Sequence, residues 1–264
     1  MRRIAPFAVL AGVFAAAGIA LAQTPNGIVR PTIPKTAPLV EQGSQLYAAN
    51  CSGCHGIDGR GVLTPGAQIA PGGVKGQGPP LQGVGAIAPD FYLRTGYMPL
   101  NNPEKQPYDT RVQFSDHEIR AIVAYVASLG KGPAIPHPHP DQGNVAAGLE
   151  LFTEHCAGCH QVAAEGGYVT DARVPLLKEQ VTPTKIAEAV RIGPYYMPKF
   201  AKKDINDRQL NSIIAYVRAS VNPADRGGWG IGHIGPVPEG IVTWLLAAVV
   251  LVVTCMVIGR RMSS

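Results

Sequence analysis

The sequence lacks two features that many proteins of its length use for folding or binding: abundant aromatic residues and clustered positive charge. Aromatic side chains make up only 6% of its 264 residues, which excludes a large aromatic core. The formal net charge is +5, but residues 23–239 contain 19 Lys and Arg against 18 Asp and Glu, a balance of +1. Because this part has no cluster of basic residues, no nucleic-acid partner is predicted.

Motifs for bond-making catalysis are also missing. The chain has no recognisable nucleophile with an adjacent base, no paired catalytic acids and no phosphate-binding loop. Its Gly-rich run Gly56-x-x-Gly59-x-Gly61 follows a Cys-x-x-Cys-His motif instead of a strand. With 31 Gly and 24 Pro, the chain is rich in turn-forming residues, so small domains with long loops are predicted.

The N-terminal end is apolar. Met1-Arg2-Arg3 precedes the apolar run Ile4–Ala22, which ends in Ala20-Leu21-Ala22. A basic start, an apolar stretch and a small-x-small ending are typical of a secretory signal peptide. The run is also long enough to be an uncleaved membrane anchor. Both interpretations of residues 1–22 stay open, and both predict that the following residues are exported.

The C-terminal end predicts a transmembrane helix over residues 240–259. Ile241–Ile258 carries no charge, Trp244 stands near its start, and Arg260-Arg261 follow it. Apolar length, an interfacial aromatic and a trailing basic pair place the 260–264 tail in the cytoplasm. A buried core helix is the alternative. The Gly-rich residues 224–239 are interpreted as a linker to this helix, and the domains before it are predicted to lie on the outer face of the cell membrane.

The polar middle of the chain is an internal repeat on either side of a Pro-rich hinge, residues 132–141. Each half contains a Gly followed by an aromatic residue, a Cys-x-x-Cys-His motif, a Pro-x-Leu element, a Met-Pro pair and an amphipathic helix. We predict two domains, residues 38–131 and 142–223. Alternating prolines make the hinge a semi-rigid spacer. His137 and His139 within it are interpreted as solvated.

The closing helix of each half is the clearest secondary-structure signal. Ser115 and Glu118 form a capping-box pattern before the first, and Asn206 with Gln209 opens the second in a similar way. Apolar residues then recur at helical spacing. They are Ile119, Ile122, Val123 and Val126 in the first helix and Leu210, Ile213, Ile214 and Val217 in the second. With little strand-like alternation between them, both domains are predicted to be all-α.

Two Cys-x-x-Cys-His motifs, 105 residues apart, predict covalently bound haem c. The first is Cys51-Ser52-Gly53-Cys54-His55, and the second is Cys156-Ala157-Gly158-Cys159-His160. Two thiols on one side of a helical turn can each bond to a vinyl group of the same porphyrin. The His that follows directly can then bind the iron. Cys51, Cys54, Cys156 and Cys159 are therefore the predicted attachment residues, and His55 and His160 are the predicted proximal ligands of two haems.

Other uses of these cysteines fit less well. A compact zinc finger needs its ligand pairs closer together than 105 residues. A thioredoxin-like dithiol needs a βαβ context, which is absent. A disulfide across three residues is strained and does not require the His.

The sixth iron ligand is predicted to be methionine. Of five methionines, Met1 is the start, Met256 lies in the apolar C-terminal run and Met262 lies in the tail. One candidate then remains in each half, Met98 and Met197, and Pro follows both. The alternative is that each of them packs in the core. His/Met ligation raises the reduction potential and leaves no open coordination position.

Each half resembles a class I cytochrome c domain. That resemblance implies that Gly43 and Tyr47 on the first helix pack against Tyr125 on the last. In the second half, it implies the same of Gly148 and Phe152 with Tyr216. It also implies that the elements Pro79–Leu81 and Pro175–Leu177 supply carbonyl groups to the proximal histidines, which would fix the orientation of their rings.

The whole chain resembles the dihaem cytochrome c subunit of the actinobacterial menaquinol–cytochrome c reductase, the cytochrome bcc complex. This resemblance implies partners: cytochrome b, a Rieske iron–sulfur subunit, an aa3-type cytochrome oxidase and membrane lipid. It implies that the chain passes electrons from the Rieske subunit towards the oxidase, as part of a proton-translocating enzyme. Two alternatives stay open: an electron-transfer subunit of another membrane dehydrogenase or oxidase, and a haem-based sensor or peroxidase.

Overall fold

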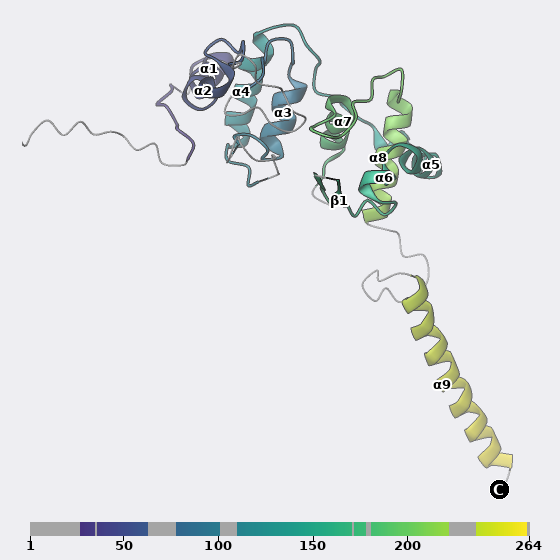
Figure 1. The fold of residues 1–264 in the computed structure, drawn as a ribbon. Helices are drawn as coiled ribbons and strands as arrows, with labels where there is room; N and C mark the ends of the chain where they lie inside the picture. The colour runs from purple at the N-terminus through teal and green to yellow at the C-terminus, as the bar shows by residue number, and fades with distance from the viewer. Residues whose placement is uncertain are drawn as a thin grey trace, which may run out of the picture.

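The computed structural model describes residues 27–34, 36–62, 78–100, 110–170, 172–177, 181–221 and 236–262. Within these ranges the chain is mostly helical, as the sequence predicts, and forms two helical domains and one long C-terminal helix (Figure 1). The predicted signal or anchor segment 1–22, and most of the linker 224–239, lie outside the described residues.

Domain 1 has four helices among its described residues, 38–62, 78–100 and 110–131. They are α1 (Leu39–Asn50), α2 (Ser52–His55), α3 (Ile87–Arg94) and α4 (Asp116–Ser128). The capping box that opens α4 is present as predicted, because Ser115 accepts a hydrogen bond from the Glu118 amide while the Glu118 carboxylate accepts one from the Ser115 amide. The predicted stripe of four apolar residues on α4 is buried.

Domain 2 repeats this order. Its elements are η1 (Pro140–Gln142), α5 (Val145–His155), α6 (Ala157–His160), β1 (Gly167–Val169), β2 (Ala172–Val174), α7 (Pro183–Ile192) and α8 (Asp207–Val221). Asn206 and Gln209 exchange side chain-to-amide hydrogen bonds of 2.9 and 3.0 Å, which confirms the predicted start of α8. The antiparallel pair β1–β2 is the one departure from helices and loops among the described residues; in it, Tyr168 pairs with Arg173.

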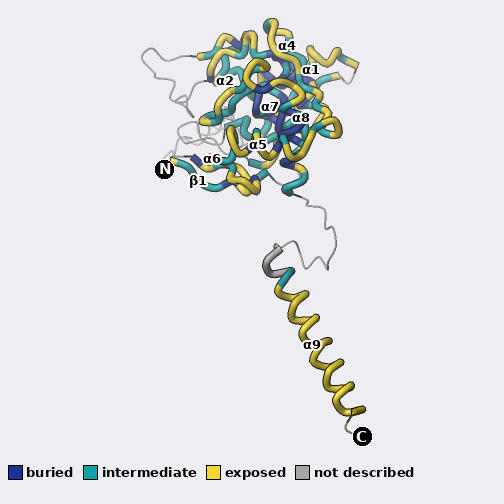
Figure 2. Tube along the Cα trace, turned by 90° about the vertical axis from the view of Figure 1, so that its right-hand side faces the viewer, coloured by how far each residue is buried: buried dark blue, intermediate teal, exposed yellow. Residues whose placement is uncertain are grey.

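Each domain is held together by a close crossing of its first and last helices. A Cβ atom added to Gly43 would collide with the Ala121 carbonyl of α4, and one added to Gly148 would collide with the Ser212 carbonyl of α8. Hydrogen in place of a side chain therefore lets the two helix backbones touch. The buried residues lie around these crossings, inside both domains (Figure 2).

An arginine on the third α-helix of each domain fixes the start of the closing helix. Arg94 binds Asp116 at 2.7 Å, and Arg191 binds Asp207 at 2.9 Å. Arg191 also donates to the carbonyl groups of Phe200 and Ile205. Asp116 and Asp207 both lie in the first turn of their helix, where a negative charge is favoured by the helix dipole.

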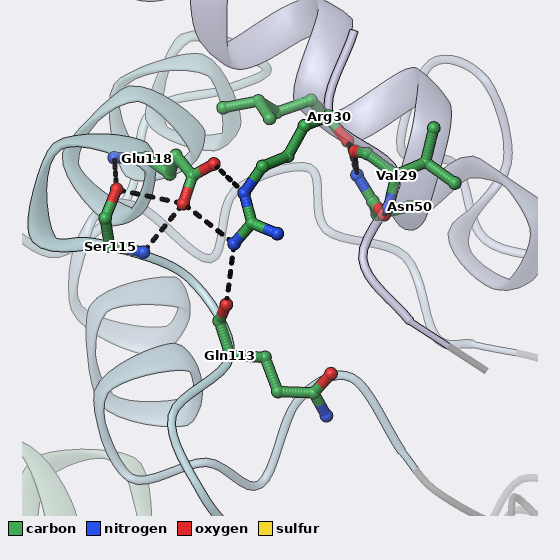
Figure 3. A network of polar contacts seen from close by, with 7 residues as sticks. Val29, Arg30, Asn50, Gln113, Ser115 and Glu118 are labelled. Atoms are coloured by element: carbon green, nitrogen blue, oxygen red, sulfur yellow. Dashed lines mark hydrogen bonds and ion pairs between the residues drawn. The ribbon is translucent and has the colours of Figure 1, made fainter. Parts of the chain in front are cut away.

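Residues 27–34 lie against domain 1, ahead of the predicted start of that domain at residue 38. The Arg30 guanidinium binds the Glu118 carboxylate at 2.7 Å and the Gln113 carbonyl at 3.0 Å. Asn50 accepts a hydrogen bond from the Val29 amide and donates one to the Val29 carbonyl, both 2.8 Å (Figure 3). The Glu118 carboxylate thus serves both the helix cap and this segment.

The Pro-rich hinge is bonded to the domains near both ends, which its composition did not predict. The Pro133 carbonyl accepts from the Ala86 amide at 3.0 Å, and Ile135 packs against the core of domain 1. At the other end, the His139 amide donates to Asn211 of α8 at 2.8 Å. His137 and His139 are exposed, as predicted.

Helix α9 (Pro236–Met262) has the length and composition of a membrane span. The most apolar 18-residue window of its segment Gly240–Met262 has a mean hydropathy of 2.8, and none of that window is buried against the rest of the chain. Figures 1 and 2 show it extending away from the two domains, and Figure 2 colours most of its residues as exposed. The Thr254 hydroxyl donates to the Val250 carbonyl within the helix, so this polar group is satisfied inside the apolar stretch.

Candidate haem-binding sites

The two Cys-x-x-Cys-His motifs form the same turn. The Cys51 amide donates to Tyr47 at 2.8 Å, which ends α1, and the His55 amide donates back to the Cys51 carbonyl at 2.9 Å. In domain 2 the corresponding bonds, from Cys156 to Phe152 and from His160 to Cys156, have the same lengths. The turn therefore places two thiols and one imidazole on a single short helix in each domain.

None of the four motif cysteines forms a disulfide. Cys51 and Cys156 are half-buried against the cores of their domains, while Cys54 and Cys159 are exposed. Burial, with a contribution from the second thiol of the motif, raises the pKa of Cys51 to about 12 and that of Cys156 to about 11. Thiols with raised pKa values stay protonated at neutral pH, which disfavours a reactive dithiol.

The part of the chain that the structure describes contains no set of ligands for a zinc ion. Among those residues, no group of three or more His, Cys, Asp and Glu side chains lies close enough to hold a metal ion. The two motifs therefore do not combine into one tetrahedral site. Each motif must therefore have a function of its own that uses two thiols and one imidazole.

The His55 ring is held by its Nδ1 atom. Nδ1 lies 2.8 Å from the Pro79 carbonyl, so it must donate, since a carbonyl only accepts. Burial lowers the pKa of His55, and the hydrogen bond to Pro79 opposes this only in part. The ring is therefore neutral, with the lone pair of Nε2 free to bind a metal. A Cβ atom on Gly78 would approach the same ring to 2.5 Å, so Gly78 also leaves space for it.

The His160 ring is held less firmly. Its Nδ1 atom is buried and has no partner at hydrogen-bonding geometry. Burial lowers the pKa of His160, and the Pro175 carbonyl lies close enough to oppose that effect. The predicted carbonyl contact is thus a hydrogen bond in domain 1 and a weaker electrostatic contact in domain 2.

The predicted aromatic pairs lie beneath both motifs. The rings of Tyr47 and Tyr125 have centroids 5.0 Å apart, and those of Phe152 and Tyr216 are 5.3 Å apart. The Tyr47 hydroxyl donates to the Gly56 carbonyl at 2.8 Å, just after His55. These pairs tie the first and last helices to the loop that follows His55 or His160, the predicted proximal histidines.

The two predicted methionine ligands pack against the same clusters as the motif cysteines. Met98 and Cys51 both contact the core of domain 1, and Met197 and Cys156 both contact that of domain 2. Both methionines are half-buried. The Met98 amide donates to the Tyr92 carbonyl and the Met197 amide to the Pro194 carbonyl, each at 3.0 Å, which fixes the two loops. Each domain thus holds its Cys, His and Met around one apolar core, an arrangement that fits a covalently attached haem with His and Met ligands.

Family models match both domains. Residues 40–130 match the model "Cytochrome c", and residues 143–217 match "Cytochrome C oxidase, cbb3-type, subunit III". The chain is 32% identical to a cytochrome bc1 complex cytochrome c subunit of Corynebacterium diphtheriae, over 91% of this chain and 87% of that protein. Proteins of the same description from Mycobacterium leprae and Mycobacterium tuberculosis are each 31% identical over 92% and 93% of this chain, and over 83% and 86% of their own lengths.

The chain belongs to the family of cytochrome bc1 complex cytochrome c subunits. Cytochrome c domains carry haem c bonded through cysteine, so haem c is a cofactor of this member of the family. A haem group and an apolar C-terminal helix agree with a membrane-bound subunit that carries electrons in a respiratory chain.

Three features of this cytochrome c subunit could not be found from the sequence. Gly78 lies against the His55 ring, but it stands in a Gly-rich stretch with no signal of its own. Glu188 is fully buried where α7 meets α3. In the sequence it looks like any polar residue of an amphipathic helix, so nothing there indicates its burial. Tyr195 also lies at this contact. Its position before Met197 was visible in the sequence, but its contact with domain 1 was not.

Proposed function

We propose that this chain is the dihaem electron-transfer subunit of a respiratory quinol–cytochrome c reductase. It binds one haem through Cys51 and Cys54 and a second through Cys156 and Cys159. The observation that carries this proposal is the duplication of one arrangement. The same Cys-x-x-Cys-His turn occurs twice, each time against a core that also holds a Met-Pro loop.

The axial iron ligands are His55 with Met98 in domain 1 and His160 with Met197 in domain 2. When bound in this way, haem iron exchanges single electrons between its ferric and ferrous states without an open coordination position. The protein supplies a neutral imidazole oriented through Nδ1, as the contact of His55 with Pro79 illustrates. The apolar cores exclude water from the methionine side of each site.

Helix α9 anchors the two domains to the membrane. Arg260 and Arg261 in its last turn favour a cytoplasmic C-terminus, and the haem domains then lie on the outer face. The anchor keeps the domains beside other membrane proteins, which raises their effective concentration.

The partners we propose are cytochrome b and a Rieske iron–sulfur subunit on the donor side and an aa3-type oxidase on the acceptor side. The similarity to bc1 complex subunits over more than nine-tenths of the chain supports the donor side. Two haems in tandem support the acceptor side, because a second tethered haem extends the reach of the first towards another site.

Purification of the native complex tests this proposal. Gentle detergent extraction should copurify b-type and a-type cytochromes with the chain, and a pyridine haemochrome assay should return two c-type haems per chain. The membranes should reduce oxygen with quinol and no added soluble carrier. Copurification with a dehydrogenase alone would overturn the partners and leave the dihaem assignment in place. A single haem per chain would overturn the dihaem assignment itself.

Single substitutions test the axial ligands. Met98→Ala and Met197→Ala should each remove half of the near-infrared sulfur-to-iron band of the ferric protein. Each should lower the potential of one haem only, since Met raises it relative to harder ligands. The control is Met256→Ala in α9, which should leave both the band and the potentials unchanged. An undiminished band in the Met98 or Met197 variant would assign that methionine to packing.

A further inference from the structure

Three tyrosines join the two domains beside the methionine loops. Tyr92 lies on α3 and Tyr97 directly precedes Met98, while Tyr195 lies two residues before Met197. Both methionine loops follow a helix of the interdomain contact, because α3 ends at Arg94, α7 ends at Ile192 and these two helices pack against each other. The contact between the domains therefore lies next to the loops that carry the proposed sixth ligands.

The tyrosine rings form a continuous chain across this contact. The centroid of Tyr195 lies 5.2 Å from that of Tyr97 and 6.0 Å from that of Tyr92. Tyr92 and Tyr97 meet edge to face at 6.4 Å within domain 1. These separations are those of aromatic rings in direct contact, so no layer of water separates the two loops at this point.

Tyr195 occupies this position at a cost to local structure. Its backbone has a φ of +54°, which side-chain-bearing residues rarely adopt, and its hydroxyl is buried without a hydrogen-bond partner. Burial raises the pKa of Tyr92 to about 12, and it raises the pKa of Tyr195 as well. Both phenols are therefore neutral. The hydroxyl of Tyr195 does not explain why an aromatic ring is placed there, so its packing across the interface must.

We propose that the cluster of Tyr92, Tyr97 and Tyr195 fixes the spacing of the two haem-binding loops and is the contact through which an electron passes from one domain to the other. This inference rests on the proposed function, in which Met98 and Met197 each bind an iron. In the step, one electron leaves a ferrous iron in one domain and reduces a ferric iron in the other. No bond forms or breaks, no proton moves, and the tyrosines remain reduced and neutral.

The physical reason is that electronic coupling falls steeply with distance, and more steeply across water than through packed atoms. The Tyr97–Tyr195 contact is the point where residues next to the two proposed ligands touch. Removing a ring there opens a gap, so the electron has to cross a longer or wetter path. We class the three tyrosines as positioning residues, since they act through the loops of Met98 and Met197.

The test measures electron transfer between the haems in the purified full-length chain after rapid photoreduction. The inter-haem phase is the one that is absent from a Cys156→Ala/Cys159→Ala chain, which carries one haem. Tyr195→Leu should slow this phase at least tenfold, whereas Tyr195→Phe should keep it close to the unaltered rate because the ring remains. Tyr168→Leu is the control, since Tyr168 is 85% exposed on β1 and lies outside the cluster.

Two further measurements separate the possible outcomes. Hydrogen exchange of the amides in α3 and α7 should increase in Tyr195→Leu, and the near-infrared methionine band should stay unchanged. If Tyr195→Leu does not fold, Tyr92→Leu tests the same contact from domain 1. An unaltered inter-haem rate with two haems and an intact band would overturn the inference. One haem, or no methionine band, in the unaltered chain would instead overturn the proposed function.

Discussion

The two domains differ most clearly at the residue after the predicted proximal histidine, His55 or His160. In domain 1 this residue is Gly56, with φ +78° and ψ 156°, and in domain 2 it is Gln161, with φ +58° and ψ 159°. This region of backbone space is essentially restricted to glycine. Three residues further on, Gly59 and Ala164 also share a positive φ. The turn after the haem motif therefore keeps its shape even where the residue resists it.

Matching hydrogen bonds explain why the shape is kept. The Gly61 amide donates to the His55 carbonyl at 2.8 Å, and the Gly166 amide donates to the His160 carbonyl at 3.0 Å. These bonds close the loop around the backbone of each proximal histidine. Domain 2 accepts strain at Gln161 to form the same loop, which agrees with a role of the loop in the proposed haem site and not only in local stability.

The aromatic pairs show a second difference between the domains, in which ring of the pair bonds to the loop. Tyr47 of domain 1 donates to the loop at Gly56, but Phe152 has no hydroxyl with which to do so. In domain 2 the partner ring takes over, because the Tyr216 hydroxyl donates to Val162 at 2.5 Å, whereas the matching contact from Tyr125 to Ile57 is 3.5 Å long. Each domain thus keeps one strong bond from its aromatic pair to the loop.

The largest expected effect is on stability, and it concerns the close helix crossing that both domains share. Gly43→Ala should destabilise domain 1 by about 4 kcal/mol, because the new methyl group forces α1 away from α4. Gly148→Ala should have a similar effect on the crossing of α5 and α8 in domain 2. Hydrogen exchange followed by mass spectrometry should show lost protection in the helices of the altered domain.

The matched control is Gly53→Ala, since nothing lies within 4 Å of a Cβ atom placed on Gly53. That variant should exchange like the unaltered chain. If Gly43→Ala and Gly148→Ala differed widely, one of the two crossings would have to relax in a way that the other cannot, and the equivalence of the domains would break there.

The next effect concerns a carboxyl group that only domain 2 has. Counted back from Gly96 and Gly193, Glu188 of α7 takes the place of Phe91 of α3. Glu188 is fully buried, and burial raises its pKa from the ordinary 4.5 to about 8. Asp90 of α3, itself bound to Arg94, adds to this effect, while Arg94 and Lys185 oppose it. At neutral pH, Glu188 is therefore mostly protonated.

Replacement of this carboxyl group should change the pH dependence of stability. The folded chain binds this proton more tightly than the unfolded chain, so the contribution of Glu188 to stability is lost as the pH rises from about 4.5 to about 8. Over this window, Glu188→Gln should gain roughly 4 kcal/mol relative to the unaltered chain. Urea unfolding at pH 5.5, 7 and 8.5 measures this difference. A constant difference at all three values would mean that Glu188 does not titrate in this range.

The smallest effect targets the strained turn. Gln161→Gly should stabilise domain 2 by about 1 kcal/mol, because the strain relieved exceeds the entropy that glycine adds to the unfolded chain. Gly56→Gln should cost domain 1 about as much or more. Thermal unfolding, followed by loss of the near-infrared methionine band, measures both. Destabilisation by Gln161→Gly would show that the Gln161 side chain contributes contacts that outweigh its backbone strain.

Local patterns predicted much of this molecule. The caps at Ser115 and Asn206, the buried stripe on each closing helix and the apolar α9 depend on neighbouring residues, which the sequence displays directly. The family assignment followed from the repeat and the haem motifs. The haem count and the ligand residues remain predictions.

Features that depend on contact between distant segments were not predicted. The burial of Glu188 arises because α7 packs against α3, about 100 residues earlier in the chain. The β1–β2 pair also escaped notice, since three-residue strands are too short to show an alternating pattern. Composition predicts a semi-rigid hinge, but it could not show that the Pro133 carbonyl and the His139 amide have partners in the domains.

These two hydrogen bonds limit how far the domains can move relative to each other, and therefore how the molecule can deliver electrons. With Pro133 and His139 held and Ile135 packed against the core of domain 1, only residues 136–138 connect the domains freely, and both Pro136 and Pro138 have a fixed φ. Such a short, stiff connection does not let a domain swing between an electron donor and an electron acceptor. Mobility would then have to come from the redox partners, which must each dock where a haem edge already faces them. The turnover rate of the assembled complex would accordingly follow the motion of those partners and not that of this subunit.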